Sequence, residues 1–82
     1  MSESNYISIT VKFFASLREY GPIKEVIDVK ENNTIKTLLD KYNIPEDMRK
    51  LIVLVNTLPT WDQNYTLKNG DVIAIFPPVG GG

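Results

Sequence analysis

The chain has 82 residues, 43% of them hydrophobic, and its nine basic and ten acidic residues give a formal net charge of −1, which predicts one globular domain and no nucleic-acid partner. It contains no cysteine and no histidine, which excludes thiol and imidazole catalysts and the usual zinc and iron–sulfur ligands, so we expect no enzyme activity of the chain alone, no metal and no bound cofactor. The longest apolar run, at 51–55, is too short to cross a membrane and residues 1–6 lack signal-peptide features, so we expect a cytoplasmic protein without a membrane partner.

The first third of the chain predicts two paired strands. Branched and aromatic residues alternate with polar ones over 7–13, which is typical of a half-buried strand. Residues 15–20 suit a short helical turn, which Gly21 and Pro22 would end because glycine tolerates positive φ and proline restricts the residue before it. Residues 23–29 then predict a second strand that pairs with the first as a hairpin.

The middle of the chain predicts the main helix and a buried strand. Apolar residues recur at helical spacing over 35–42, behind Thr34, whose side chain can cap the first turn. Residues 43–50 suit a short second helix because Pro45 lacks the amide hydrogen that a first helical turn leaves unpaired. The unbroken apolar run at 51–55 predicts a strand that is buried on both faces at the centre of a sheet.

The last third predicts a short edge strand near Trp61, a hairpin turn at Asn69-Gly70, and a final strand over 72–76. No internal repeat is present. The order of elements therefore predicts an α+β roll, in which a mixed sheet of four to five strands is covered by one main helix. We assign residues 1–79 to this single domain, with a short disordered N-terminus at 1–5 and a flexible glycine tail at 80–82.

The last residues combine two prolines with three glycines. Pro77 and Pro78 favour an extended path and would prolong the final strand as a stiff stalk. A terminus without side chains, such as Gly80, Gly81 and Gly82, can enter a narrow active site of another protein. We therefore predict that the reacting group is the main-chain carboxylate of Gly82, activated as an acyl adenylate and attacked by a nucleophile from elsewhere. A frayed end or an expression remnant is the open alternative.

Three segments carry a family resemblance. Residues 13–19 (FFASLRE) are similar to the first strand and following turn of the family, and 55–57 (VNT) with 67–71 (LKNGD) are similar to its later turns. Residues 76–82 (FPPVGGG) resemble its terminal signature of an aromatic, two prolines, a small aliphatic, a variable residue and Gly-Gly. Gly80 departs from the commoner Ser, Thr or Ala at the variable position. The family is the small subunit of molybdopterin synthase (MoaD), a group of β-grasp, ubiquitin-like sulfur carriers.

The resemblance implies a β-grasp fold and a role in molybdenum cofactor biosynthesis. It implies that an E1-like enzyme uses ATP to adenylate Gly82, that a sulfur donor converts the adenylate into a thiocarboxylate, and that this sulfur enters a pterin precursor. The partner would be the large subunit of molybdopterin synthase, which carries the catalytic pocket and would form a heterotetramer with this chain. Gly80 and Gly81 would thread into that pocket.

An apolar surface near the tail is the predicted docking site. Strand alternation places Phe14 opposite Phe13, on the outer face of the sheet. An exposed apolar patch often marks an interface, so we predict that the large subunit contacts Phe14, Phe76, Pro77, Pro78 and Val79. The residues leave open that Phe14 is instead buried under the turn at 15–20.

Three other functions remain open from the sequence. The same tail suits a ubiquitin-like protein modifier that is conjugated through Gly82. A sulfur carrier of the thiamine-synthesis type shares the fold and tail, but is typically shorter and lacks the Phe-Pro-Pro stalk at 76–78. A plain interaction domain with a frayed end would not need Gly81 or Gly82.

Overall fold

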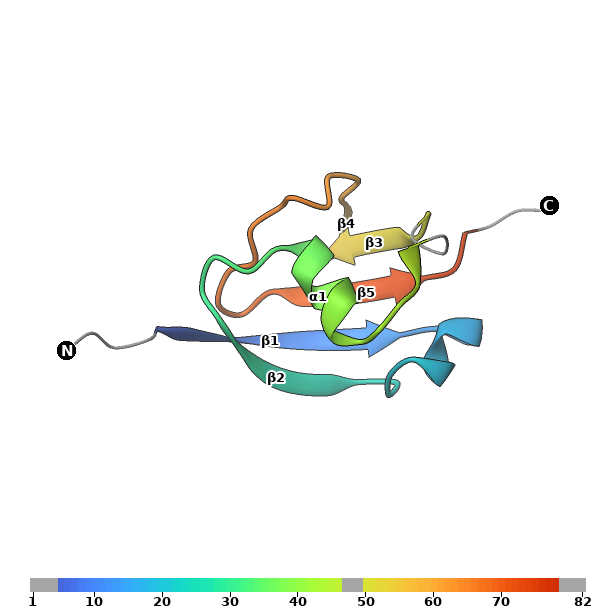
Figure 1. Cartoon of the computed structure of the whole chain (residues 1–82), viewed down its shortest axis with the longest axis horizontal. Coiled ribbons are helices and arrows are strands. Elements are labelled where there is room, and N and C mark those ends of the chain that lie inside the picture. The colour runs from blue at the N-terminus through green and yellow to red at the C-terminus, as the bar shows by residue number, and fades with distance from the viewer. Residues whose placement is uncertain (1–4, 47–49, 79–82) are drawn as a thin grey trace.

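In the part of the chain that the structure describes, five strands form one mixed sheet, and a helix lies across one of its faces (Figure 1). The structure is a computed structural model that describes residues 5–46 and 50–78. The strand order in the sheet is β2-β1-β5-β3-β4, where β1 and β5 are parallel and the other pairs are antiparallel. The elements are β1 (Tyr6–Phe13), the 3-10 helix η1 (Ala15–Glu19), β2 (Glu25–Lys30), α1 (Ile35–Lys41), β3 (Ile52–Val55), β4 (Leu58–Pro59) and β5 (Val72–Phe76). The predicted α+β β-grasp architecture is confirmed.

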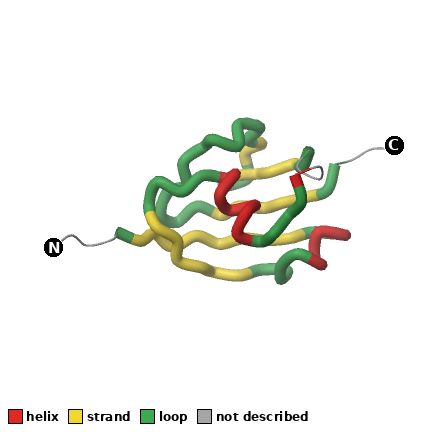
Figure 2. Tube along the Cα trace, in the orientation of Figure 1, coloured by secondary structure: helices red, strands yellow, loops and turns green. Residues whose placement is uncertain are grey.

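The hydrophobic core lies between α1 and the face of the sheet that this helix covers (Figure 2). Alternate residues of β1, β3 and β5 point into it, because successive side chains of a strand face opposite sides. Burying each of these large aliphatic or aromatic side chains contributes about 1.5–3 kcal/mol. The buried hydrophobic residues are Ile9, Val11, Phe13, Leu17, Ile35, Leu38, Leu39, Ile44, Leu51, Val53, Val55, Leu67, Ile73 and Ile75.

The main helix begins where the sequence predicts it. Thr34 is the N-cap, and its side-chain oxygen accepts a hydrogen bond from the Thr37 amide at 3.3 Å. The Thr37 hydroxyl oxygen accepts one from the Thr34 amide at 2.8 Å. These reciprocal bonds satisfy two backbone donors that the start of a helix leaves unpaired. None of the helices in the described part of the chain has the length and apolar character to traverse a bilayer.

The turn after β1 is helical, as predicted, but Gly21 has a different role from the expected one. A Cβ at this position would overlap the aromatic ring of Phe13, which is fully buried in the core. The positive φ among the described glycines belongs instead to Gly70, at 88°. Gly21 is therefore needed for close packing against Phe13, not for an unusual backbone angle.

Two expectations about the sheet are wrong. The apolar run at 51–55 predicted the central strand, yet β3 lies fourth in the order and β5 is the central strand. In β3, Val53 and Val55 are buried, whereas Ile52 and Leu54 are only partly buried on the other face. The Asn69-Gly70 turn forms, but it joins β5 to a long loop and not to a hairpin partner.

Other expectations concern the edges of the described segments. β2 starts two residues later than predicted and pairs with β1 antiparallel, as expected. β4 is a short edge strand that ends two residues before Trp61, whose side chain is exposed. The predicted second helix at 43–50 includes residues 47–49, which lie outside the described residues, as do 1–4 of the expected disordered N-terminus.

Candidate functional site

Two phenylalanines stack where β1 and β5 end side by side. The parallel register pairs Phe13 with Ile75, and the Phe14 amide donates to the Ile75 carbonyl at 3.1 Å, so the pairing continues past β1. Phe14 and Phe76 follow these two residues on the neighbouring strands. Their rings lie 4.3 Å apart between centroids and are inclined by 6°, and both residues are partly buried. The structure therefore brings together two of the predicted interface residues.

Ala15 turns the chain away from the sheet immediately after Phe14. Its φ is 55°, in the left-handed region, which costs a non-glycine residue on the order of 1–2 kcal/mol. The next residues form η1, in which the Leu17 amide donates to the Phe14 carbonyl at 3.1 Å and the Leu17 side chain is buried. Burial of the Leu17 side chain offsets the free-energy cost of the Ala15 backbone conformation. Phe14, which precedes this turn, stays on the sheet and packs against Phe76.

An apolar hollow of about 440 Å³ adjoins this aromatic stack, on the face of the sheet opposite α1. The register pairs Ile52 with Phe76 and Leu54 with Ala74, which places both β3 side chains on the same face as Phe76. Among the residues that the structure describes, no ionisable side chain lines it. The hollow, called here the tail-side hollow, is lined by Ala15, Ile52, Leu54, Phe76, Pro77 and Pro78.

Sequence reasoning missed Ile52 and Leu54. The signal was present in the unbroken apolar run at 51–55, because a strand with one exposed face normally alternates apolar and polar residues. The run by itself predicts a strand that is buried on both faces. It reflects instead a strand whose second face forms part of an apolar surface, and such surfaces mark binding sites more often than chance allows.

The predicted site residues beyond Pro78 are not described. Pro77 is partly buried and Pro78 is exposed, directly after β5. Val79, Gly80, Gly81 and Gly82 lie outside the described residues. Among the described residues, no group of three or more Asp or Glu side chains could hold a metal ion. The side chains of the tail-side hollow provide apolar contact area.

A buried carboxylate fixes the other end of β5. Asp71, which is 5% exposed, accepts hydrogen bonds from Asn56 Nδ2 at 2.9 Å, from the Tyr65 hydroxyl at 3.0 Å and from the Lys68 amide at 2.9 Å. Asn56 Oδ1 in turn accepts from the Val72 amide at 2.8 Å. This network joins the turn after β3 to the first residue of β5, and thereby holds the strand that leads to Pro77.

Two tyrosines have shifted pKa values, and neither lines the tail-side hollow. Burial raises the pKa of Tyr65, and the hydrogen bond to the Asp71 carboxylate and its charge raise it further. Burial likewise raises the pKa of Tyr42, with a smaller contribution from its 2.8 Å hydrogen bond to Glu25 Oε1. The Tyr42 ring also contacts Phe13 edge-on, at 4.8 Å between centroids. Both hydroxyls serve structural hydrogen bonds.

Comparison with known proteins decides the family. Residues 11–82 match the sequence family described as the ThiS family. The chain belongs to the ThiS family. The matched range includes both residues of the aromatic stack, every residue of the tail-side hollow and the glycines through Gly82. This ThiS-family chain is thus a ubiquitin-like sulfur carrier of the MoaD/ThiS type, and the predicted family is confirmed.

Similar proteins come from an animal, a bacterium and an archaeon. The chain is 25% identical, across the whole length of both proteins, to the molybdopterin synthase sulfur carrier subunit of Anopheles gambiae. It is 29% identical, with a TM-score of 0.59 over 93% of this chain and 100% of the other, to a chain in the complex of subunits 1 and 2 of the molybdopterin-converting factor from Helicobacter pylori. It is 25% identical, with a TM-score of 0.73 over 89% of this chain and 99% of the other, to small archaeal modifier protein 1 of Haloferax volcanii.

Proposed function

We propose that this ThiS-family chain is the sulfur-carrier subunit of a molybdopterin synthase and that its working group is the carboxylate of Gly82. The observation that carries the proposal is the tail-side hollow, an apolar surface that lies directly beside the residues leading to the glycines. The family match through Gly82 and the names of the Anopheles and Helicobacter relatives support it. The surface for a partner and the group for transfer are then four residues apart along the chain, from Pro78 to Gly82.

The chemistry follows from what this chain lacks. Without cysteine or histidine it has no strong side-chain nucleophile for acyl transfer, and a carboxylate is a poor electrophile. An E1-like enzyme would therefore join a Gly82 carboxylate oxygen to the α-phosphorus of ATP and release pyrophosphate. Hydrosulfide delivered by a donor would then displace AMP and leave a thiocarboxylate. When the thiocarboxylate sulfur attacks a carbon of a pterin precursor, water would cleave the resulting thioester, which leaves the sulfur on the pterin and returns the Gly82 carboxylate.

The tail-side hollow would dock the large subunit. The walls of the hollow lose little conformational entropy on binding, because Phe76 is already stacked on Phe14, Ile52 and Leu54 belong to β3, and the proline rings restrict the backbone. Apolar and aromatic contacts of this kind form the buried centres of interfaces. Gly80 and Gly81 would thread into the large subunit's catalytic pocket, since without side chains they fit a narrow channel. We propose a cytoplasmic heterotetramer.

A truncation separates docking from chemistry. A chain that lacks Gly81 and Gly82 should bind the large subunit about as tightly as the full chain, because the tail-side hollow is intact. It should fail to restore cofactor synthesis in a strain without its own small subunit. Phe76→Ala should show weakened binding instead. Restoration of synthesis by the truncated chain would contradict the proposal.

A protein-modifier role is a second candidate, favoured by the similarity to small archaeal modifier protein 1. In that case a lysine amine of another protein, instead of a sulfur nucleophile, would attack the Gly82 adenylate, displace AMP and form an amide bond. The test is a search for protein conjugates in extracts of the source organism. Conjugates that disappear when Gly82 is removed would establish the modifier role, and their absence would favour sulfur transfer.

A further inference from the structure

β2 is an edge strand with unpaired backbone groups. In the sheet formed by residues 5–46 and 50–78, it pairs with β1 on one side and has no neighbour on the other. The Glu31 amide donates to the Asn5 carbonyl at 3.0 Å, one pair beyond Tyr6↔Lys30. Because bonded and non-bonded pairs alternate in an antiparallel ladder, the backbone groups of Val26, Asp28 and Lys30 face away from β1. One of these six groups, the Lys30 carbonyl, accepts a bond from Asn33 Nδ2 at 2.8 Å.

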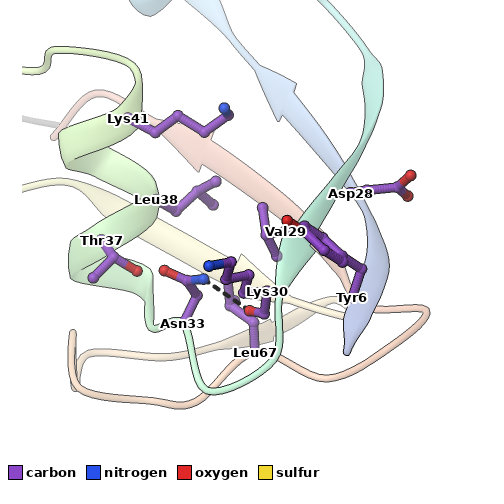
Figure 3. A pocket seen from close by; sticks show the side chains of 9 residues that line it. All are labelled: Tyr6, Asp28, Val29, Lys30, Asn33, Thr37, Leu38, Lys41 and Leu67. Atoms are coloured by element: carbon purple, nitrogen blue, oxygen red, sulfur yellow. Dashed lines mark hydrogen bonds between the residues drawn. The ribbon is translucent and has the colours of Figure 1, made fainter. Parts of the chain in front are cut away.

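A groove lies beside this edge, between β2 and α1 (Figure 3). Its volume is about 280 Å³, which is at or below the lower limit of ordinary small-molecule pockets and suits one or two side chains. Val29, Leu38 and Leu67 give it an apolar lining. In Figure 3 the β2 side chain of Val29 lies across from the α1 side chain of Leu38. A strand added to β2 would direct alternate side chains towards this groove.

The charges around the groove favour an acidic ligand. Lys30 and Lys41 line it, both are exposed, and in residues 5–46 and 50–78 neither lies within ion-pair distance of a carboxylate. Asp28 also lines the groove, but Figure 3 shows its carboxylate on the side of β2 away from α1. Two ammonium groups that form no ion pair with the described residues therefore lie beside the groove, where the neighbours of an inserted apolar side chain would be.

We propose that the β2 edge and this groove together bind an extended peptide segment of a partner protein, with an apolar residue in the groove and acidic residues beside it. The main chain of the segment would pair with Val26, Asp28 and Lys30, which gives affinity, and the groove would select the apolar side chain. The groove includes Tyr6, the first residue of β1, whereas Phe14 follows the last residue of β1, and the groove lies on the α1 face of the sheet, opposite the tail-side hollow. Both surfaces can be occupied at once.

Amide hydrogen exchange of the full chain tests the proposal. The probe is the peptide acetyl-Asp-Asp-Val-Leu-Val-Asp-Asp-amide, with a version that carries lysine at the four acidic positions as its control. In the free protein the amides of Val26, Asp28 and Lys30 should exchange fast, whereas those of Ile27 and Val29 are protected by β1. Saturating acidic peptide should slow exchange at the three edge amides, and the lysine peptide should not. Unchanged exchange at these amides would overturn the proposal.

Two matched variants test the charge requirement. Lys41→Gln removes a charge from the groove and should weaken peptide binding roughly two- to fivefold at low salt. Lys36→Gln removes one from the same helix outside the groove, where Lys36 pairs with Asp40 at 3.6 Å, and should leave binding unchanged. Equal effects of the two variants would refute the charge argument. Protection of the edge amides that rises with protein concentration alone would assign the edge to a second copy of this chain and would overturn the peptide proposal.

Discussion

The Asp71 network makes a sharp prediction about stability. In Asp71→Asn, the oxygen of the new amide can replace the carboxylate oxygen that accepts from Tyr65 and Lys68. Its NH₂ group must then face Asn56 Nδ2, which is also a donor. Asn56 cannot rotate to help, because its Oδ1 already accepts from the Val72 amide. One hydrogen bond to a buried charge is lost and two donors oppose each other, which costs about 2–3 kcal/mol.

A second substitution should reverse this loss. In the double variant Asp71→Asn with Asn56→Asp, the new carboxylate accepts from both the Val72 amide and the new amide, so every bond of the network has a donor and an acceptor again. Urea unfolding should show a midpoint lowered by roughly 1–2 M for Asp71→Asn. The double variant should return to within about 1 kcal/mol of the natural chain. If the double variant instead loses the sum of the unfolding free energies that the two single variants lose, the hydrogen bonds assigned to this network are wrong.

Three further predictions test single contacts. Phe14→Ala should weaken binding of the large subunit about tenfold or more in calorimetry, while Tyr6→Ala, at the far end of β1, should not. Equal affinities of Phe14→Ala and the natural chain for the large subunit would show that the stack is not part of the interface. Gly21→Ala should lower the unfolding free energy by about 1–3 kcal/mol through overlap with Phe13, and an unchanged melting temperature would contradict that contact. The raised pKa of Tyr42 means that the folded state holds the phenol proton more tightly than the unfolded state does. The protonated phenol therefore contributes to the unfolding free energy below pH 10, and this contribution is lost as the pH rises further. Tyr42→Phe should flatten the fall of the unfolding free energy above pH 10, and an equally steep fall in the variant and the natural chain would refute the assignment.

The sequence predicted the elements whose signals are local. β5 has the predicted bounds at 72–76, and the helix begins after Thr34, because alternation, helical spacing and capping all act within a few residues. The position of Phe14 was also predictable, since strand alternation alone puts its side chain on the outer face. That Phe76 lies beside Phe14 depends on the parallel register of β1 and β5, which the sequence does not show.

The features that were not predicted depend on distant partners. The place of β3 in the sheet follows from its pairing with β5, some 20 residues away, and an apolar run contains no information about that order. The Asn69-Gly70 turn was visible, but the bond between Asp71 and Asn56 spans 15 residues and joins two turns. The residue type of Gly21 predicts a turn, whereas its contact with the Phe13 ring depends on how the chain folds.

Intact mass spectrometry tests the central claim most directly. The chain is incubated with an E1-like enzyme, ATP and a sulfur donor, next to a control version without Gly81 and Gly82. We predict that the full chain gains the mass difference of one sulfur in place of one oxygen, and that fragmentation locates the exchange at Gly82. An unchanged mass of the full chain, with an activating enzyme that is active on a known carrier, would contradict the account.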